Sequence, residues 1–498
     1  MVSYESIHDH GLRFGRLLAN TLKRCRLHPG DEWHFDEMFS RIRGKEHHLW
    51  RAVDQGGHVL DILVQSRRSA KAAKRFFRKL LKGRLTCCGA CHQASTMRIT
   101  AIETIRQPSR PAYLWLQVHT DAGLFGLGEA QRGVEAVEAV LHGPAAAVLL
   151  GENPLDVERH NGRLLGGYLG FNASSAETRA AGAVDLALWD LLGQALGQPV
   201  SRLLGSAVRD RIPVYNTCAG DGYNRHQERR VVRPGDPPPA EMDDQAWFMH
   251  AADELAGSLL ADGFAGMKIW PFDPWALDGG GTYASAAAIR AGLEPFERVR
   301  RVHGGAMELL VELHSLWSVP AAQRICTALE PLDPLWIEDP VRRMDDVAAV
   351  AAVARATRVP LAGGETLASR PIFRDLLNRD ALGTVIIDLG WCGGLSEARR
   401  IAVLADSWAR PVAPHDCSGP VSFAASVHLA MHAPNAAFQE CVRAFLGGWY
   451  RDTVTDLPRV AGGFVHSLPG PGLGTRLLPG FAERPGAIVR RTTLKGTA

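Results

Sequence analysis

The sequence predicts an α/β protein whose larger part is a barrel of alternating strands and helices. From about residue 212, short apolar runs alternate with helical stretches, as parallel β/α units do. A polar residue ends six successive runs, at separations of 26, 27, 23, 27 and 25 residues: Glu312, Glu338, Glu365, Asp388, His415 and Glu440. An eight-unit barrel uses about 30 residues per unit. We therefore expect the barrel over residues 212–442, with these side chains at its C-terminal, catalytic face.

A separate domain is expected ahead of the barrel, over residues 97–211. The runs "MRITAIETIR" and "PAYLWLQVHTDAGLFGLGEA" alternate apolar and polar residues, as antiparallel strands joined by a short turn do. Helical patterns follow, most clearly over residues 177–205. The pattern of apolar and polar residues in this segment therefore differs from that of the barrel that follows it.

The front of the chain, residues 1–96, differs from the rest in charge. It holds 18 basic and 9 acidic residues, a net charge of +9, whereas residues 97–498 hold 38 basic and 44 acidic residues, a net charge of −6. The front segment contains three predicted strands and one very basic predicted helix: residues 33–43, 47–53, 58–65 and 69–82. A basic N-terminal segment followed by an acidic remainder suggests that the two parts of the chain have different origins.

Residues 29–83 resemble the start of the catalytic domain of insertion-sequence transposases of the RNase H-like kind. The resemblance implies that Asp36, in "WHFDE", is the first of three metal-binding carboxylates. The second and third carboxylate segments do not follow, and two-metal phosphoryl transfer needs several converging carboxylates. We interpret residues 1–96 as a non-functional relic and its junction, left by a gene fusion or a misplaced start codon, and able at most to bind nucleic acid weakly.

Composition and cysteine usage indicate an ordinary globular protein of the cytoplasm. The chain is 46% hydrophobic and 22% charged, with no apolar run long enough for a membrane span and no recognisable secretory signal. Most of its nine cysteines are scattered, which favours reduced thiols over a disulfide framework. The cluster "CCGAC" at 87–91 resembles half a zinc site, but no second Cys/His pair has fitting spacing.

Three of the strand-end residues predict a metal site. Glu312, Glu338 and Glu365 come from three successive strands, and three carboxylates at one barrel mouth repel one another unless a cation lies between them. Oxygen ligation with room for water and substrate suits Mg²⁺. The alternative is three separate surface carboxylates at loop starts, which their common register disfavours.

The next strand ends predict a general base. His415 ends one strand in "PVAPHDCSGPV", and Asp388 ends the strand before it, so the carboxylate is placed to orient the imidazole and raise its basicity. Glu440 faces the same mouth, either as a substrate-binding carboxyl group or as part of a salt bridge. His428 and His432 are interpreted as structural. Together these residues predict removal of the proton next to a substrate carboxylate.

The stretch "ELLVELHSLW", residues 308–317, is expected to be a buried strand in which Glu312 and His314 share one face, because side chains two apart point the same way. A buried carboxylate and a buried imidazole need partners. We expect the metal to be the partner of Glu312.

Residues 97 to about 485 resemble the enolase superfamily, in its mandelate racemase and muconate lactonizing enzyme branch. The motifs that carry the resemblance are "AGAVDLALWDLLGQALGQPVSRLLG", "LWIEDP", "GGETLASR", "VIIDLGWCGGLSEARRIA" and "APHDCSGPV". It implies an α+β capping domain over a (β/α)7β barrel, with residues 443–498 returning to the cap. It also implies a metal held by the three glutamates, with Glu312 where the first ligand is usually Asp, a His415–Asp388 dyad, and Glu440 as the last-strand glutamate.

Within that branch the sequence resembles galactonate-type acid-sugar dehydratases. Racemases carry Lys-x-Lys on the second strand, but here the second position is Trp270, which cannot take a proton. The "acidic-x-His" pattern on the third strand implies that His314 is the acid that protonates the departing hydroxyl. Lys268 is expected near the substrate carboxylate, and Tyr168 and Phe171, in a glycine-rich cap loop at 166–172, are expected to face the substrate.

The expected activity is a Mg²⁺-dependent dehydration of an acid sugar to a 2-keto-3-deoxy sugar acid. A cycloisomerase or epimerase shares the same first step and is the main competing interpretation. Two further possibilities are a transposase remnant that binds DNA and a catalytically silent barrel that serves as a binding protein. The family tendency implies a homo-oligomer with an even number of subunits.

Overall fold

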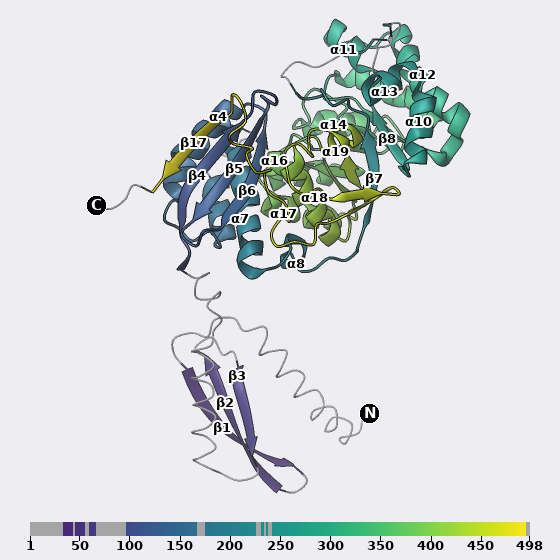
Figure 1. The fold of residues 1–498 in the computed structure, drawn as a ribbon. Coiled ribbons are helices and arrows are strands. Elements are labelled where there is room, and N and C mark those ends of the chain that lie inside the picture. The colour runs from purple at the N-terminus through teal and green to yellow at the C-terminus, as the bar shows by residue number, and fades with distance from the viewer. Residues whose placement is uncertain are drawn as a thin grey trace. The chain divides into compact units, whose positions relative to one another are not determined.

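The computed structural model divides the chain into two compact units, residues 1–92 and 93–498 (Figure 1). The structure describes residues 33–42, 45–54, 59–65, 96–166, 175–225, 231–233, 236–237 and 242–494. None of the helices in this described part of the chain combines the length and the hydropathy that a membrane span needs.

The first unit contains a three-stranded antiparallel sheet in the order β1-β2-β3. Its strands are β1 (Trp33–Ile42), β2 (Lys45–Asp54) and β3 (Val59–Gln65), which confirms the three predicted strands. In the ladder Asp36 of β1 lies opposite Arg51 of β2. The predicted basic helix at 69–82 and the cysteine cluster at 87–91 lie outside the described residues.

The cap of the second unit is a four-stranded antiparallel sheet in the order β17-β4-β5-β6. Its strands are β4 (Ile99–Arg106), β5 (Tyr113–Thr120), β6 (Phe125–Gln131) and β17 (Ile488–Thr493). β17 lies beside β4 at the edge of the sheet (Figure 1). The accompanying helices are α4 (Val134–Val140), η1 (Leu141–Ala145), α5 (Ala146–Leu149), α6 (Val157–Leu165), α7 (Ala176–Leu196) and α8 (Val200–Leu203).

The barrel is built from parallel strands paired in chain order. They are β7 (Ile212–Thr217), β8 (Gly266–Ile269), β9 (Glu308–Glu312), β10 (Trp336–Glu338), β11 (Leu361–Gly363), β12 (Thr384–Ile387), β13 (Val412–Pro414) and β14 (Gln439–Cys441). β14 pairs with β7, and a parallel bridge between Val412 and Ala436 joins the β13 edge to the chain just before β14. The ring is therefore closed, and the predicted (β/α)7β barrel is confirmed.

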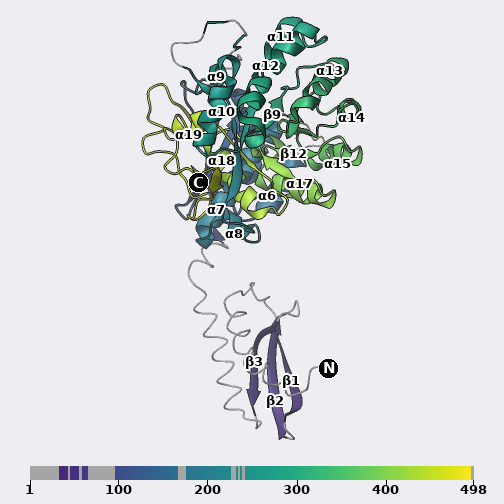
Figure 2. The same ribbon diagram turned by 90° about the vertical axis from the view of Figure 1, so that its right-hand side faces the viewer.

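Helices connect successive strands and surround the ring, as Figure 2 shows. They are α9 (Asp244–His250), α10 (Ala252–Ala261), α11 (Asp273–Gly279), α12 (Ala286–His303), η3 (Gly304–Ala306), α13 (Val319–Leu329), η4 (Glu330–Leu332), α14 (Val347–Ala354), α15 (Arg370–Asn378), α16 (Leu389–Cys392), α17 (Leu395–Ser407) and α18 (Pro420–His432). After the barrel come α19 (Arg443–Gly447) and the hairpin β15 (Arg459–Ala461) and β16 (Phe464–His466), which pairs with β7.

Six barrel strands contribute an apolar layer of buried side chains that is separate from the outer core: Tyr215, Leu310, Trp336, Ala362, Ile386 and Ala413. Side chains two apart on a strand point the same way. The residues two positions after Leu310, Trp336 and Ile386 are Glu312, Glu338 and Asp388, so these polar groups lie above the apolar layer, at the C-terminal end of the barrel.

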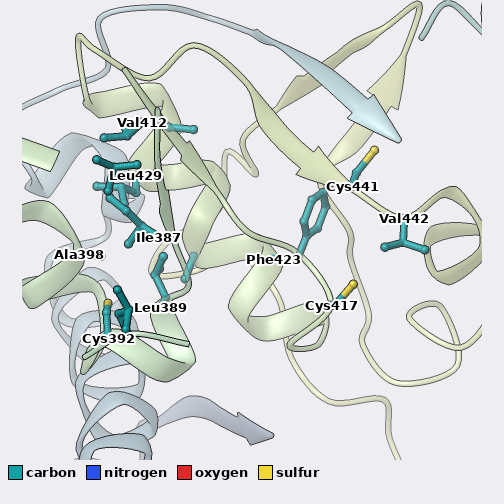
Figure 3. Packing of buried hydrophobic residues seen from close by; sticks show 14 of the residues in the cluster. Ile387, Leu389, Cys392, Ala398, Val412, Cys417, Phe423, Leu429, Cys441 and Val442 are labelled. Carbon is teal, nitrogen blue, oxygen red and sulfur yellow. The ribbon is translucent and has the colours of Figure 1, made fainter. Parts of the chain in front are cut away.

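The outward faces of the strands pack on the helices. Ile387 of β12 and Val412 of β13 are buried near Leu429 of α18, as Figure 3 shows. Burying side chains of this size contributes roughly 1.5–3 kcal/mol each. This outer core holds the strand ends, and therefore the polar side chains above the barrel, in fixed register.

Candidate active site

Three glutamates converge at the C-terminal ends of β9, β10 and β11. Glu312 and Glu338 are the last residues of their strands and lie directly opposite each other in the parallel ladder. One oxygen from each of Glu312, Glu338 and Glu365 lies within 4.8 Å of the other two. Burial, and then the repulsion between the carboxylates, raises the pKa of Glu312 well above its usual range.

The glutamate of β11 reaches this group because of a glycine turn. β11 ends at Gly363, and Gly364 adopts φ +123°. A Cβ there would lie 2.6 Å from the carbonyl oxygen of Ile386 on the next strand, so a side chain cannot be accommodated. This turn explains why Glu365, and not residue 364, joins the cluster.

The buried lysine of β8 neutralises part of this charge. The Nζ of Lys268 lies 2.9 Å from Glu338, 3.0 Å from Glu440 and 3.5 Å from Glu312. Burial alone would lower the pKa of Lys268, but the surrounding carboxylates outweigh burial and raise this pKa well above its usual range. Even so, Oε2 of Glu312 receives no hydrogen bond from the described residues. The oxygen donor set therefore fits a hard divalent cation such as Mg²⁺.

Glu440 is held on the opposite side of the barrel mouth. Its carboxylate accepts hydrogen bonds from Thr217 Oγ1 and from Tyr215 OH, the latter at 3.1 Å, in addition to its ion pair with Lys268. The side chain is fully buried. Its partners come from β7 and β8, so its position depends on closure of the ring.

The two residues predicted as a base dyad are in contact. Nδ1 of His415 lies 2.6 Å from Oδ2 of Asp388, and Nε2 lies 3.1 Å from Oε2 of Glu365. Burial would lower the pKa of His415, but the nearby carboxylates, Glu365 first, raise it well above its usual range. The backbone N–H groups of Gly390 and Trp391 donate to Oδ1 of Asp388 at 2.7 and 3.1 Å. This carboxylate is therefore fixed before it orients the imidazole.

The cap holds the segment that follows His415. Tyr113 OH and Gln131 Nε2 donate to the carbonyl of Cys417 at 2.9 and 3.0 Å. Glu129 Oε2 accepts from the N–H groups of Val421 and Ser422, both at 2.9 Å, in the first turn of α18. Strands β5 and β6 therefore contribute directly to the placement of the dyad.

His314 lies in a turn and not on a strand, which corrects the sequence prediction. β9 ends at Glu312, and His314 and Ser315 adopt φ of 50° and 55°. The alternation of a strand therefore does not place this imidazole. Instead, the N–H of His314 donates to Oε1 of Glu312 at 2.6 Å and closes the chain into a turn over the strand end.

Two residues that the sequence did not point out hold the ring of His314. Nδ1 lies 2.8 Å from Oδ2 of Asp273, and Nε2 lies 2.9 Å from the hydroxyl of Tyr223. Asp273 is the first residue of α11, after β8, and Tyr223 follows β7. An acidic residue soon after the "MKIW" strand was the only available signal for Asp273.

One cavity collects most of the predicted site. Its lining includes seven predicted residues, namely Lys268, Trp270, Glu312, His314, Glu365, His415 and Glu440. Glu338 and Asp388 lie behind them, against Lys268 and His415 respectively. Residues that sequence reasoning missed also line it, namely Gln131, Arg132, Thr217, Tyr223, Asn224, Thr366, Trp391 and Cys417. Tyr168 and Phe171 lie outside the described residues.

The remaining predicted histidines lie in other surroundings. His428 is buried and contacts the N–H of Ser201 and the carbonyl of Leu473. Burial lowers its pKa to about 4. His432 contacts the carbonyl of Ser206.

Comparison with protein families separates the same two parts of the chain. Residues 91–205 match the mandelate racemase/muconate lactonizing enzyme N-terminal domain, and residues 250–480 match the enolase C-terminal domain-like family. Residues 30–87 match a DDE domain, which agrees with the predicted resemblance to a transposase.

Relatives cover nearly all of the second unit. A D-galactonate dehydratase from Ralstonia nicotianae is 31% identical over 388 residues, which are 76% of this chain and 91% of the relative. The crystal structure of an enolase protein from Sargasso Sea environmental sequencing is 46% identical, with a TM-score of 0.72, over 80% of this chain and all of that chain. An Agrobacterium tumefaciens enolase of the mandelate racemase subgroup is 43% identical, with a TM-score of 0.71, over 80% and 99%. The chain belongs to the enolase superfamily, in its mandelate racemase and muconate lactonizing enzyme branch.

Proposed function

We propose that the protein is a Mg²⁺-dependent acid-sugar dehydratase, a hydro-lyase that yields a 2-keto-3-deoxy sugar acid. The supporting observation is the pair of imidazoles on one cavity, His415 and His314, each held by its own carboxylate. Elimination of water needs one group to take a proton and another to give one. A cavity that carries two such groups beside three clustered glutamates suits that reaction.

In the proposed reaction, His415 takes the proton from the carbon next to the substrate carboxylate. The electron pair of that C–H bond forms a carbon–carbon double bond as the bond from the neighbouring carbon to its hydroxyl breaks. His314 protonates the departing hydroxyl, which leaves as water. The enol that remains becomes the 2-keto-3-deoxy acid. Asp388 favours the charged form of His415 after it has taken the proton.

Glu312, Glu338 and Glu365 would hold the Mg²⁺. When bound, it supplies positive charge close to the substrate carboxylate, where negative charge develops as the proton leaves. We propose that Lys268, 2.9 Å from Glu338, adds a fixed positive charge beside the same carboxylate. Glu440 then lies across the cavity mouth as a partner for a substrate hydroxyl.

Other features favour dehydration over two-base racemization. Trp270 stands where racemases of this branch carry a lysine base, and it packs edge-on against the His314 ring at 5.3 Å between centroids. An indole cannot accept a proton from carbon, so the β8 side of the cavity lacks a second base at this position. The name of the Ralstonia relative, D-galactonate dehydratase, supports the same class of reaction.

The test is a screen of the full-length protein, with Mg²⁺, against a library of aldonic and aldaric acids. Semicarbazide absorbance reports 2-keto acid products, and exchange of the α-proton in D2O reports enolization separately. We expect a 2-keto-3-deoxy product from at least one acid sugar. α-Proton exchange with an epimerised or lactone-rearranged product would contradict dehydration and assign the protein as an epimerase or cycloisomerase. The even-numbered homo-oligomer and the cytoplasmic location stay predictions.

A further inference from the structure

We propose a second metal site, specific for Zn²⁺ and similar thiophilic cations, formed by His415, Cys417 and Glu440. One ligand atom from each of these residues lies within 4.8 Å of the other two. All three side chains are nine-tenths or more buried and line the same cavity. None of the three glutamates that form the proposed Mg²⁺ site is a ligand of this second site, although Oε2 of Glu365 lies 3.1 Å from Nε2 of His415.

Contacts from the cap hold the backbone of Cys417 in an unusual conformation. Its φ is +138°, a region that residues with a side chain rarely occupy. Tyr113 OH and Gln131 Nε2 donate to its carbonyl from the cap side, and its thiol sulfur lies within 4.8 Å of a ring nitrogen of His415. Other buried cysteines behave differently, since they donate to backbone carbonyls instead: Cys218, Cys392 and Cys441.

The donor set of the second site differs in chemistry from that of the glutamates. A ring nitrogen, a thiolate and a carboxylate are the ligands that Zn²⁺ takes, commonly as three protein ligands with a fourth open position. Tetrahedral ligation at the usual bond lengths separates the ligand atoms by roughly 3.5 Å. The three ligand atoms lie within 4.8 Å of one another, so Zn²⁺ binding requires them to approach by at most about 1.3 Å. Mg²⁺, which prefers oxygen, gains nothing from the thiol.

The surroundings of the second site favour an additional cation. Five carboxylates surround the cavity, and among the described residues Lys268 and His415 are paired with them: Glu312, Glu338, Glu365, Glu440 and Asp388. With the imidazole neutral, as a metal ligand is, one Mg²⁺ and Lys268 balance only three of the five formal negative charges. Asp388 also holds Nδ1 of His415, and a carboxylate behind a histidine is the usual support of a zinc-bound ring.

Zn²⁺ at this site would occupy the imidazole that we assign as the base. The expected inhibition rests on the proposed function, whereas the binding of Zn²⁺ to these three residues does not. Zn²⁺ also competes with Lys268, whose ammonium lies 3.0 Å from Oε1 of Glu440. We therefore expect Zn²⁺ to inhibit in the presence of saturating Mg²⁺, and removal of Cys417 to weaken that inhibition at least about 10-fold.

The test uses Co²⁺ as a probe, because thiolate ligation to Co²⁺ gives a near-ultraviolet charge-transfer band that oxygen ligation lacks. For this experiment, four cysteines near the N-terminus of the full-length protein are replaced by serine, so that their thiols give no band: Cys25, Cys87, Cys88 and Cys91. Mg²⁺ is present in excess. We expect a band that one equivalent of Zn²⁺ removes, that disappears in Cys417→Ser, and that persists in the matched control Cys326→Ser, a buried cysteine of α13.

Absence of the band before Cys417 is changed, or its persistence in Cys417→Ser, would overturn the proposal. Far-ultraviolet circular dichroism checks that the variant is folded, and Cys417→Ala serves if the serine variant is not. Since the spectrum needs no substrate, the band tests the metal site even if no acid sugar is turned over. A failure of the dehydratase assay and a failure of the zinc site are therefore distinguishable.

Discussion

The two histidines of the cavity are placed by different means. His415 follows the last residue of β13 directly, and its partner Asp388 follows the last residue of β12, the neighbouring strand in the ladder. His314 lies two residues beyond β9 in a left-handed turn, and its partner Asp273 begins a helix after β8. The first pair is set by strand register, whereas the second is set by two loops.

This difference shows which groups of the proposed reaction are positioned by the barrel strands themselves. The Asp388 carboxylate accepts from backbone N–H groups, from His415 and from Ser418, so the proposed base has a rigid support. His314 depends on the side chains of Asp273 and Tyr223. The proposed proton removal therefore depends on the barrel strands themselves. The proposed acid depends on loops, which vary more easily than strands do.

The largest expected effect comes from His415→Asn. Loss of the base should reduce both α-proton exchange and dehydration by about 10²–10⁴-fold or more, because both need the same proton removal. The measurement is exchange by NMR in D2O and product formation with semicarbazide. His432→Asn, a change at a histidine outside the cavity, is the control and should leave both rates within about twofold. If α-proton exchange persisted in His415→Asn, another residue would have to be the base.

The next effect separates the two histidines. His314→Asn should reduce dehydration by about 10²–10⁴-fold, since the leaving hydroxyl loses its acid. Exchange of the α-proton should fall far less, because His415 and its partners are unchanged. The same two assays measure this ratio. Equal loss of both rates would contradict separate roles and would make His314 part of the proton-removal machinery.

A smaller effect is expected when each histidine loses its carboxylate partner. Asp388→Asn should lower exchange and dehydration together by about 10²-fold or more, because an amide facing Nδ1 favours the wrong tautomer. Asp273→Asn should lower dehydration alone, by about 10-fold. Rates of both steps for the two variants, measured side by side, test the difference in support. A larger loss of α-proton exchange in Asp273→Asn than in Asp388→Asn would contradict the expected difference between the two histidines.

The last prediction concerns stability and not rate, through the cap residue that holds the helix after His415. Burial raises the pKa of Glu129 to about 8 from 4.5. The folded protein therefore keeps a proton that the unfolded chain releases, and the free energy of unfolding falls as the pH rises from about 4.5 to about 8. Glu129→Gln should remove this fall, which is on the order of a few kcal/mol.

Urea unfolding at pH 5, 7 and 9 measures the effect of this substitution. The amide oxygen of glutamine still accepts the N–H groups of Val421 and Ser422, so the fold is preserved. We expect the variant to gain stability relative to the original protein as the pH rises. Parallel pH profiles for the two proteins would show that Glu129 is not the titrating group.

Much of the barrel could be predicted because strand ends repeat at regular spacing. Glu312, Glu338, Asp388 and His415 are each the last residue of a strand or the next one, where period and register suffice to place them. Asp273 and Tyr223 could not be predicted in this way. They reach His314 from 41 and 91 residues away in the sequence, through loops whose course no local pattern fixes.

By itself the sequence determined the order of the strands, the family and the set of polar groups at the barrel mouth. Because side chains alternate along each strand, the local sequence is enough to place those polar groups at the mouth of a closed barrel. Only the tertiary structure decided that His314 leaves the strand, that Lys268 lies among the glutamates, and that the thiol of Cys417 lies near His415. These positions depend on backbone turns and on contacts from the cap, which form only when distant parts of the chain pack together.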